Sequence, residues 1–132
     1  MSRGLRVDRA ISCVFSSRWS RFSATLAAAV KDLGEEGASD GLEADENGVV
    51  YAGDYEHDSI RRRLPDGMWR SIAHDPRILW PDTLSVGNDG YLCFTATQVR
   101  RQAMFHHGHD LRKKPYTLFR IKIDAKPVAL DR

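Results

Sequence analysis

The chain lacks most of the features that assign a function at first reading. Its 132 residues contain only two cysteines, Cys13 and Cys93, which lie 80 positions apart. This excludes a disulfide framework and a CxxC metal or redox motif, and it leaves two free thiols or a single disulfide as the alternatives. The apolar stretch from Leu26 to Val30 is too short for a signal-peptide core and far below the ~20 residues that cross a bilayer. A membrane partner is therefore not expected.

An excess of charge of one sign is also missing. Twenty Lys and Arg residues stand against 18 Asp and Glu residues, which gives a net charge of +2. Proteins that bind nucleic acid usually carry a concentrated basic face. The strongest basic cluster here is the run of three arginines at 61–63, whose members would alternate between the two faces of a strand. We interpret it as a solvated strand surface, with phosphate binding as the lesser alternative, and expect no nucleic-acid partner.

No P-loop, Rossmann fingerprint or GxSxG motif appears. The segment from His106 to Asp110 holds three histidines and could bind zinc or nickel adventitiously. Its spacing differs from HExxH, and a solvated loop is the better interpretation. In the acidic stretch at 54–58, Glu56 and His57 are conceivable as an acid–base pair, but the pattern is unspecific.

What the sequence does contain, from Ser39 onward, is a series of strands and turns. Asn-Gly at 47–48, Pro-Asp-Gly at 65–67 and Asp-Gly at 89–90 each separate two strand-like runs. The first four predicted strands cover Gly41–Glu46, Val49–Tyr55, Ser59–Leu64 and Met68–Ala73, and further strands are predicted at 83–86, 91–95 and 116–124. Before them, the Ala- and Leu-rich segment 24–33 predicts a short helix that Gly34 ends.

Two of these segments repeat each other. Asp40 falls on Asp82 and Leu42 on Leu84, each at an offset of 42 residues, and the two turn dipeptides coincide at the same offset. A period of ~40–50 residues made of short antiparallel strands matches one four-stranded propeller blade. Chance is the alternative, because two copies do not prove a repeat. The prediction is an all-β fold, a partial β-propeller of about two four-stranded blades with a short N-terminal helix.

Three stretches carry a resemblance to a known family. They are SDGLEADENGVVYAGDYEHDSI (39–60), AHDPRILWPDTLSVGNDGYLCFT (73–95) and DLRKKPYTLFRIKID (110–124). Together they resemble the Yellow/major royal jelly protein family, over about Leu26 to Asp124, and are distantly similar to gluconolactonase-type six-bladed propellers. The resemblance implies the C-terminal portion of such a propeller at 24–132, preceded by an unmatched, irregular segment at 1–23. The parent family is secreted or periplasmic, whereas this sequence shows no signal peptide.

The resemblance also implies candidate site residues. Propellers bind ligands in a central channel lined by the innermost strand of each blade, so Asp82, Thr83, Thr97 and Gln98 are candidates for a small-molecule site. In the family's amine-binding members, the end of the corresponding strand resembles FTSNQ. This chain has Thr97 where those members carry an amide side chain. Asp40, in Ser-Asp-Gly, resembles the metal-binding aspartate of gluconolactonase-like propellers, which makes a divalent cation such as calcium a candidate cofactor. The alternative for Asp40 is a turn residue that accepts backbone N–H bonds.

Three functions follow from these patterns. The first is a propeller portion that binds a small ligand in its channel. The second is an enzyme, either a metal-dependent lactonase-like hydrolase or a dopachrome-converting isomerase. The third is a truncated fragment without function. Because blades stack on their neighbours, we expect two blades alone to need the missing blades or to self-associate.

Overall fold

The computed structural model describes residues 30–129, and the chain divides into two units, Met1–Glu36 and Gly37–Arg132. The described part of the first unit, 30–36, has no regular secondary structure. The predicted helix at 24–33 falls mostly outside the described residues, and its last four residues, 30–33, are not helical. The predicted irregular segment at 1–23 lies outside the described residues. Among the residues that are described, no helix is long and apolar enough to span a membrane.

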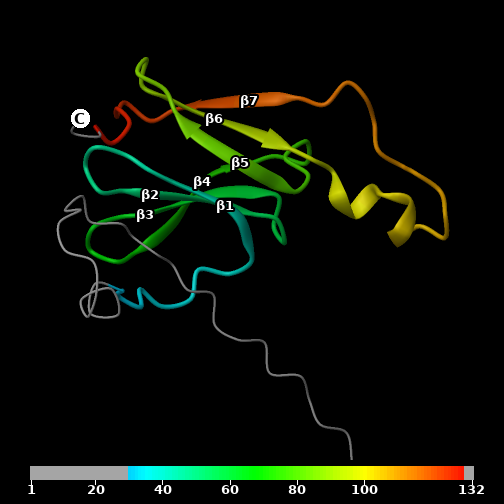
Figure 1. Ribbon diagram of the computed structural model, residues 1–132, viewed down its shortest axis with the longest axis horizontal. Coiled ribbons are helices and arrows are strands. Elements are labelled where there is room, and N and C mark those ends of the chain that lie inside the picture. The colour runs from blue at the N-terminus through cyan, green and yellow to red at the C-terminus, as the bar shows by residue number, and fades with distance from the viewer. Residues whose placement is uncertain (1–29, 130–132) are drawn as a thin grey trace, which may run out of the picture. The chain divides into compact units, whose positions relative to one another are not determined.

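The second unit consists of two antiparallel sheets (Figure 1). The first sheet contains β1 (Ser39–Ala44), β2 (Val50–Asp54), β3 (Ser59–Arg63) and β4 (Trp69–His74), in that order. The second contains β5 (Pro81–Val86), β6 (Tyr91–Ala96) and β7 (Leu118–Lys122), and two 3-10 turns, η1 (Val99–Arg101) and η2 (Ala103–Phe105), lie between β6 and β7. The all-β fold class with two blade-like sheets is confirmed. The second sheet has three strands where the first has four.

The offset of 42 residues is preserved in the pairing of the strands. The pairs of β1 with β2 are Ser39–Asp54, Leu42–Ala52, Glu43–Tyr51 and Ala44–Val50, and those of β5 with β6 are Pro81–Ala96, Leu84–Phe94, Ser85–Cys93 and Val86–Leu92. In both hairpins the register shifts after the first pair. The turns match too, because the amide of Asp45 bonds the Val49 carbonyl and the amide of Gly87 bonds the Tyr91 carbonyl. The internal repeat is therefore a property of the structure.

The core lies between the two sheets. Its buried members are Tyr51, Ile60, Ile78, Leu84, Val86, Leu92 and Phe94, and Phe119 and Ile121 pack against it from β7. The predicted alternation along β7 is confirmed, since Phe119 and Ile121 are partly buried and Leu118 is 68% exposed. Burial of one such large apolar side chain is worth roughly 1.5–3 kcal/mol. The buried apolar side chains of this cluster thus hold the two sheets together.

A buried polar group closes the end of the sheets that carries the β1–β2 turn. Asp45 is 2% exposed, and its carboxylate accepts two backbone amides of its own turn and the hydroxyl of Tyr51 at 2.8 Å. Burial, followed by the bond to Asp45, raises the pKa of Tyr51 above its ordinary value. The C-terminal segment returns to this turn, where the Glu46 amide donates to the Lys126 carbonyl at 2.9 Å. The segment after β7 is therefore tied to the first sheet.

Candidate functional site

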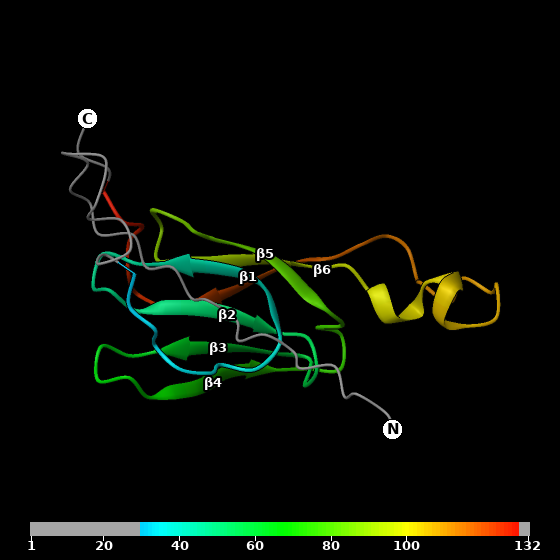
Figure 2. The ribbon, with the colours of Figure 1, turned by 60° about the horizontal axis from the view of Figure 1, so that its bottom comes forward.

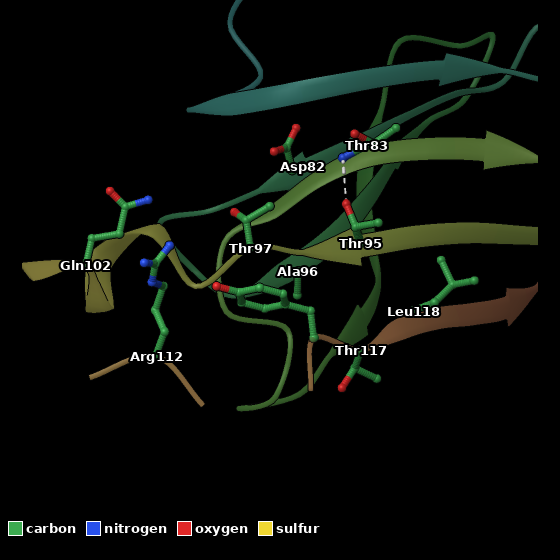
Figure 3. Close-up of a pocket in the computed structure, with 10 residues that line it drawn as sticks. Asp82, Thr83, Thr95, Ala96, Thr97, Gln102, Arg112, Thr117 and Leu118 are labelled. Atoms are coloured by element: carbon green, nitrogen blue, oxygen red, sulfur yellow. Dashed lines mark hydrogen bonds between the residues drawn. The ribbon is translucent and has the colours of Figure 1, made fainter. Parts of the chain in front are cut away.

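A pocket of about 520 Å³ lies at the edge of the second sheet where β5 begins and β6 ends (Figure 3). Its lining residues are Asp82, Thr83, Thr95, Ala96, Thr97, Gln102, Arg112, Tyr116, Thr117 and Leu118. Figure 3 shows the side chains of β5 and β6 along one side of the pocket, with Gln102 and Arg112 on another. The site therefore combines strand ends with the connection between β6 and β7.

The pocket lies where the second repeat has threonines in place of two glycines of the first repeat. A Cβ atom built on Gly41 would lie 1.8 Å from the backbone oxygen of Asp82, and one built on Gly53 would lie 3.0 Å from the backbone oxygen of Pro81. Glycine at these two positions lets the sheets touch. The register places Thr83 and Thr95 at the equivalent positions of the second repeat. Their side chains line the pocket, and the Thr83 amide donates to the Thr95 hydroxyl oxygen at 3.3 Å.

The connection after β6 supplies the other walls. The first repeat joins β2 to β3 with four residues, 55–58, whereas the second joins β6 to β7 with twenty-one residues, 97–117. Figure 2 shows the longer connection leaving the same end of the sheets as the β2–β3 turn. The lining residues Thr97, Gln102, Arg112, Tyr116 and Thr117 all belong to it. At this edge the second repeat has two threonines in place of glycines and a longer connection, and the pocket lies where the three meet.

Of the four residues predicted to bind a small molecule, Asp82, Thr83 and Thr97 line the pocket. Gln98 is not among the lining residues. Its backbone has a left-handed φ of 55°, and its amide group pairs with the backbone of Lys113 through two bonds of 2.9 and 3.0 Å. The role that this geometry gives Gln98 is to close the base of the connection. Whether any of these residues binds a ligand stays a prediction.

Sequence reasoning did not single out Thr95, Gln102, Arg112, Tyr116 or Thr117. Two signals in the sequence point to them. The first is the replacement of Gly53 by Thr95 at the offset of 42 residues, and the second is the polar stretch between the strand ending near Thr95 and the strand containing Leu118. A longer connection in only one of two repeats is typical of a functional loop.

Of the two charged side chains that line the pocket, Arg112 is paired with another described residue and Asp82 is not. The guanidinium of Arg112 is paired with the carboxylate of Asp110, with N–O distances of 2.6 Å from its terminal nitrogen and 3.0 Å from Nε. The side-chain bond from Arg112, and then its backbone bond, lowers the pKa of Asp110 to about 2. Arg112 is thus neutralised by Asp110, while Asp82 forms no ion pair within residues 30–129. The pocket therefore favours a ligand with a positive charge or a strong donor.

Asp40, the candidate metal ligand, is placed differently from its counterpart Asp82. It lies exposed on β1, outside the pocket lining, and its carboxylate accepts a hydrogen bond from the indole N–H of Trp80. The Trp80 ring stacks on Tyr55 with ring centroids 4.2 Å apart and an interplanar angle of 8°. The backbones at the two aspartates meet through Gly41, but the two carboxylates have different surroundings.

The described residues do not fit a divalent-cation site by themselves. In the part of the chain that the structure describes, no three His, Cys, Asp or Glu side chains are placed to share a metal ion. In the histidine-rich segment, His106 Nε2 bonds the backbone oxygen of Arg100 at 2.8 Å, and Asp110 is held by Arg112. The exposure of His107 and His109 agrees with a solvated loop. A calcium-like cofactor stays a prediction that these residues do not support.

In the acidic stretch after β2, His57 pairs with Asp54 and not with Glu56. His57 Nδ1 bonds the carboxylate of Asp54 at 2.9 Å, whereas Glu56 contributes only its backbone amide to the same aspartate. Asp54 is 7% exposed, and the side chain of His57 is 74% exposed. The tight turn brings residues three apart together, which strand alternation did not predict. Asp54 therefore shapes the turn and orients an exposed histidine.

No family model matches the chain, and no curated protein does. Among solved structures, the chain is similar to selenomethionine-substituted virginiamycin B lyase from Staphylococcus aureus, with 14% identity and a TM-score of 0.43, over 68% of this chain and 29% of that one. The matched part thus spans less than a third of that structure, and at this TM-score we draw no conclusion about activity from it. The resemblance to the Yellow/major royal jelly family stays a prediction.

Proposed function

We propose that the second repeat binds a small organic molecule in the pocket between β5, β6 and the connection at 97–117. The observation that carries the proposal is the contrast between the repeats. Where glycines bring the two sheets into contact, the second repeat has Thr83 and Thr95 beside a carboxylate and a polar loop. A concave site with a few convergent polar groups is the usual form of a ligand site.

The lining indicates the chemical class of the ligand. Asp82 offers a carboxylate that no cation in the described residues neutralises, and threonine hydroxyls can donate or accept beside it. Ala96, Tyr116 and Leu118 offer apolar surface. A small molecule with an apolar body and an ammonium group satisfies both parts. The amine-binding members of the resembled family carry an amide where this chain has Thr97, so the proposed class rests on the pocket lining and not on the resemblance.

Binding is favoured over catalysis by the residues that line the pocket. The lining contains no histidine and no cysteine, so acid–base chemistry there would rest on Asp82 and Tyr116. The Asp54–His57 pair is not part of the lining. No observation favours the lactonase-like or isomerase alternative. Secretion of the parent protein, and a need for further blades, remain expectations of the resemblance.

The test uses tyramine, an arylalkylamine, as the probe in titration calorimetry. We expect saturable binding that weakens in Asp82→Asn by about 10–100-fold, because a charge-assisted bond contributes roughly 1.5–3 kcal/mol. Asp40→Asn is the matched control, since it makes the same change at the equivalent place in the first repeat. Its affinity should stay within about twofold of wild type, a difference well under 1.4 kcal/mol. Absence of binding, or an equal loss in both variants, would show that the pocket is not the site.

A further inference from the structure

The connection at 97–117 is closed upon itself at its base. The side-chain amide of Gln98 both donates to and accepts from the backbone of Lys113, and the Leu111 amide donates to the Arg101 carbonyl at 2.8 Å. Inside this closure lie the two 3-10 turns η1 and η2. Gln102 and Arg112, two residues of the pocket lining, therefore move with one folded segment.

One side chain joins this segment to the first repeat. The terminal guanidinium nitrogen of Arg100 donates to the backbone oxygen of Tyr55 at 2.6 Å and to the carboxylate of Asp58 at 2.7 Å. Both acceptors lie in the β2–β3 turn. The backbone oxygen of Arg100 accepts from His106 at 2.8 Å, which ties the same residue to the end of η2. Arg100 thus connects a loop of the second sheet with a turn of the first.

Tyr55, one of the two residues that accept from Arg100, is connected through Trp80 to the pocket residue Thr97. Tyr55 stacks on Trp80, and the backbone oxygen of Trp80 accepts both the amide and the hydroxyl of Thr97, at 3.0 and 3.2 Å. Thr97 lines the pocket, and it begins the connection that carries Arg100. The contacts from Thr97 through Trp80 and Tyr55 to Arg100 therefore form a closed circuit along this edge of the two sheets.

We propose that Arg100 is a positioning residue that fixes the wall of the pocket by anchoring the 97–117 connection on the β2–β3 turn. This inference rests on the proposed function for its effect on ligands. Arg100 is absent from the pocket lining, so it acts through Gln102 and Arg112. Apart from those of Arg100, the hydrogen bonds that join the connection to the rest of the described unit lie at Thr97 and Gln98. Without the anchor, its inner residues therefore lose their fixed distance from Asp82 and Thr83. A ligand then has to order the wall as it binds, which weakens its affinity.

The experiment compares Arg100→Ala with Arg101→Ala, which removes the neighbouring guanidinium of the same loop. Amide hydrogen exchange is measured at Phe105 and Leu111, whose N–H groups bond within the segment. We expect exchange at these amides to rise by about tenfold or more in Arg100→Ala, with no change in Arg101→Ala and a melting temperature within about 2 °C of wild type in both. Arg100→Lys keeps the charge and should restore part of the protection.

Ligand and fluorescence readouts complete the test. Tyramine affinity should fall about tenfold in Arg100→Ala and stay unchanged in Arg101→Ala. The emission of Trp80, followed in a background in which Trp19 and Trp69 are replaced by Phe, should shift in Arg100→Ala because its stacking partner Tyr55 is released. Unchanged exchange together with unchanged Trp80 emission in Arg100→Ala would overturn the positioning role. Failure of wild type to bind tyramine would overturn the proposed ligand class, while the exchange data would still decide the role of Arg100.

Discussion

Gly41 of β1 lies directly against the backbone oxygen of Asp82 in β5, and a Cβ atom at this position would stand 1.8 Å from that oxygen. Only glycine fits such an approach, so the second residue of the Asp-Gly pair in the first repeat serves packing. The second repeat has Thr83 at the same place and forms a pocket there. One position of the repeat thus brings the sheets into contact in one copy and lines an open pocket in the other.

Gly41→Ala should therefore destabilise the unit more than Gly53→Ala. The first change meets backbone at 1.8 Å and the second meets the Pro81 backbone oxygen at 3.0 Å. Overpacking costs typically about 1–3 kcal/mol, so we expect Gly41→Ala at or above the upper end of this range and Gly53→Ala near the lower end. Urea denaturation of both variants measures the difference. Equal stabilities would mean that the contact between β1 and β5 is looser than described.

Because the pKa of Tyr51 is raised, we predict that the protein loses stability at alkaline pH. Burial and the bond to Asp45 raise its pKa above the ordinary value of 10.0. A raised pKa means that its contribution is complete below about pH 10 and declines as the pH rises further. Tyr51→Phe should cost about 0.5–1.5 kcal/mol at pH 7, the net worth of a typical hydrogen bond, and should flatten the alkaline decline. Unfolding free energies between pH 8 and pH 11 test this, and an unchanged slope in Tyr51→Phe would refute it.

From the pair of Asp110 and Arg112 we predict a contribution to stability that is lost at low pH. Bonds from Arg112 lower the pKa of Asp110 from 3.8 to about 2. The contribution of the pair is therefore present above about pH 4 and is lost as the pH falls toward 2. Carbon-13 titration of the carboxyl group should give a midpoint near 2 that returns toward 3.8 in Arg112→Ala. Asp75, held in the same manner by Arg77, is the internal control and should not move.

Leu118 predicts how the isolated chain associates. It pairs with Thr95 as Ile60 pairs with Gly53, yet Ile60 is fully buried between the sheets and Leu118 is 68% exposed. An apolar residue at a position that the repeat otherwise buries favours association. Leu118→Lys should lower the self-association seen by analytical ultracentrifugation. Met104→Lys, a change at a residue 77% exposed on η2, should not. A wild-type chain that stays monomeric, or two variants that behave alike, would contradict this.

Much of the fold could be predicted because its turns are marked by residue type. The Asn-Gly and Asp-Gly dipeptides placed the strands within one or two residues, as in Ser59–Leu64 against β3 at Ser59–Arg63. The offset of 42 residues proved to be a structural repeat because Leu42 and Leu84 hold equivalent registers. Local turn chemistry and alternation are properties of short segments, so one sequence reveals them.

The site could be predicted only in part, because it depends on contacts between distant segments. Asp82 and Thr83 follow from the repeat, but the importance of Thr95 appears only once Gly53 is seen to touch Pro81. Nothing in the sequence around Gln98 indicates the left-handed backbone or the bond from its amide group to Lys113. A single residue with positive φ redirects a side chain without any signal in hydrophobic periodicity.

The most direct test of the ligand pocket is a nitrogen-15 NMR titration of the protein with tyramine. We predict saturable shifts concentrated at the amides of Thr83, Thr95 and Thr97, with none at Gly48 and Gly90, which lie in the turns at the other end of the two sheets. The same dissociation constant should be obtained from each shifted amide. Shifts that fail to saturate, or that centre on another part of the described chain, would contradict the account.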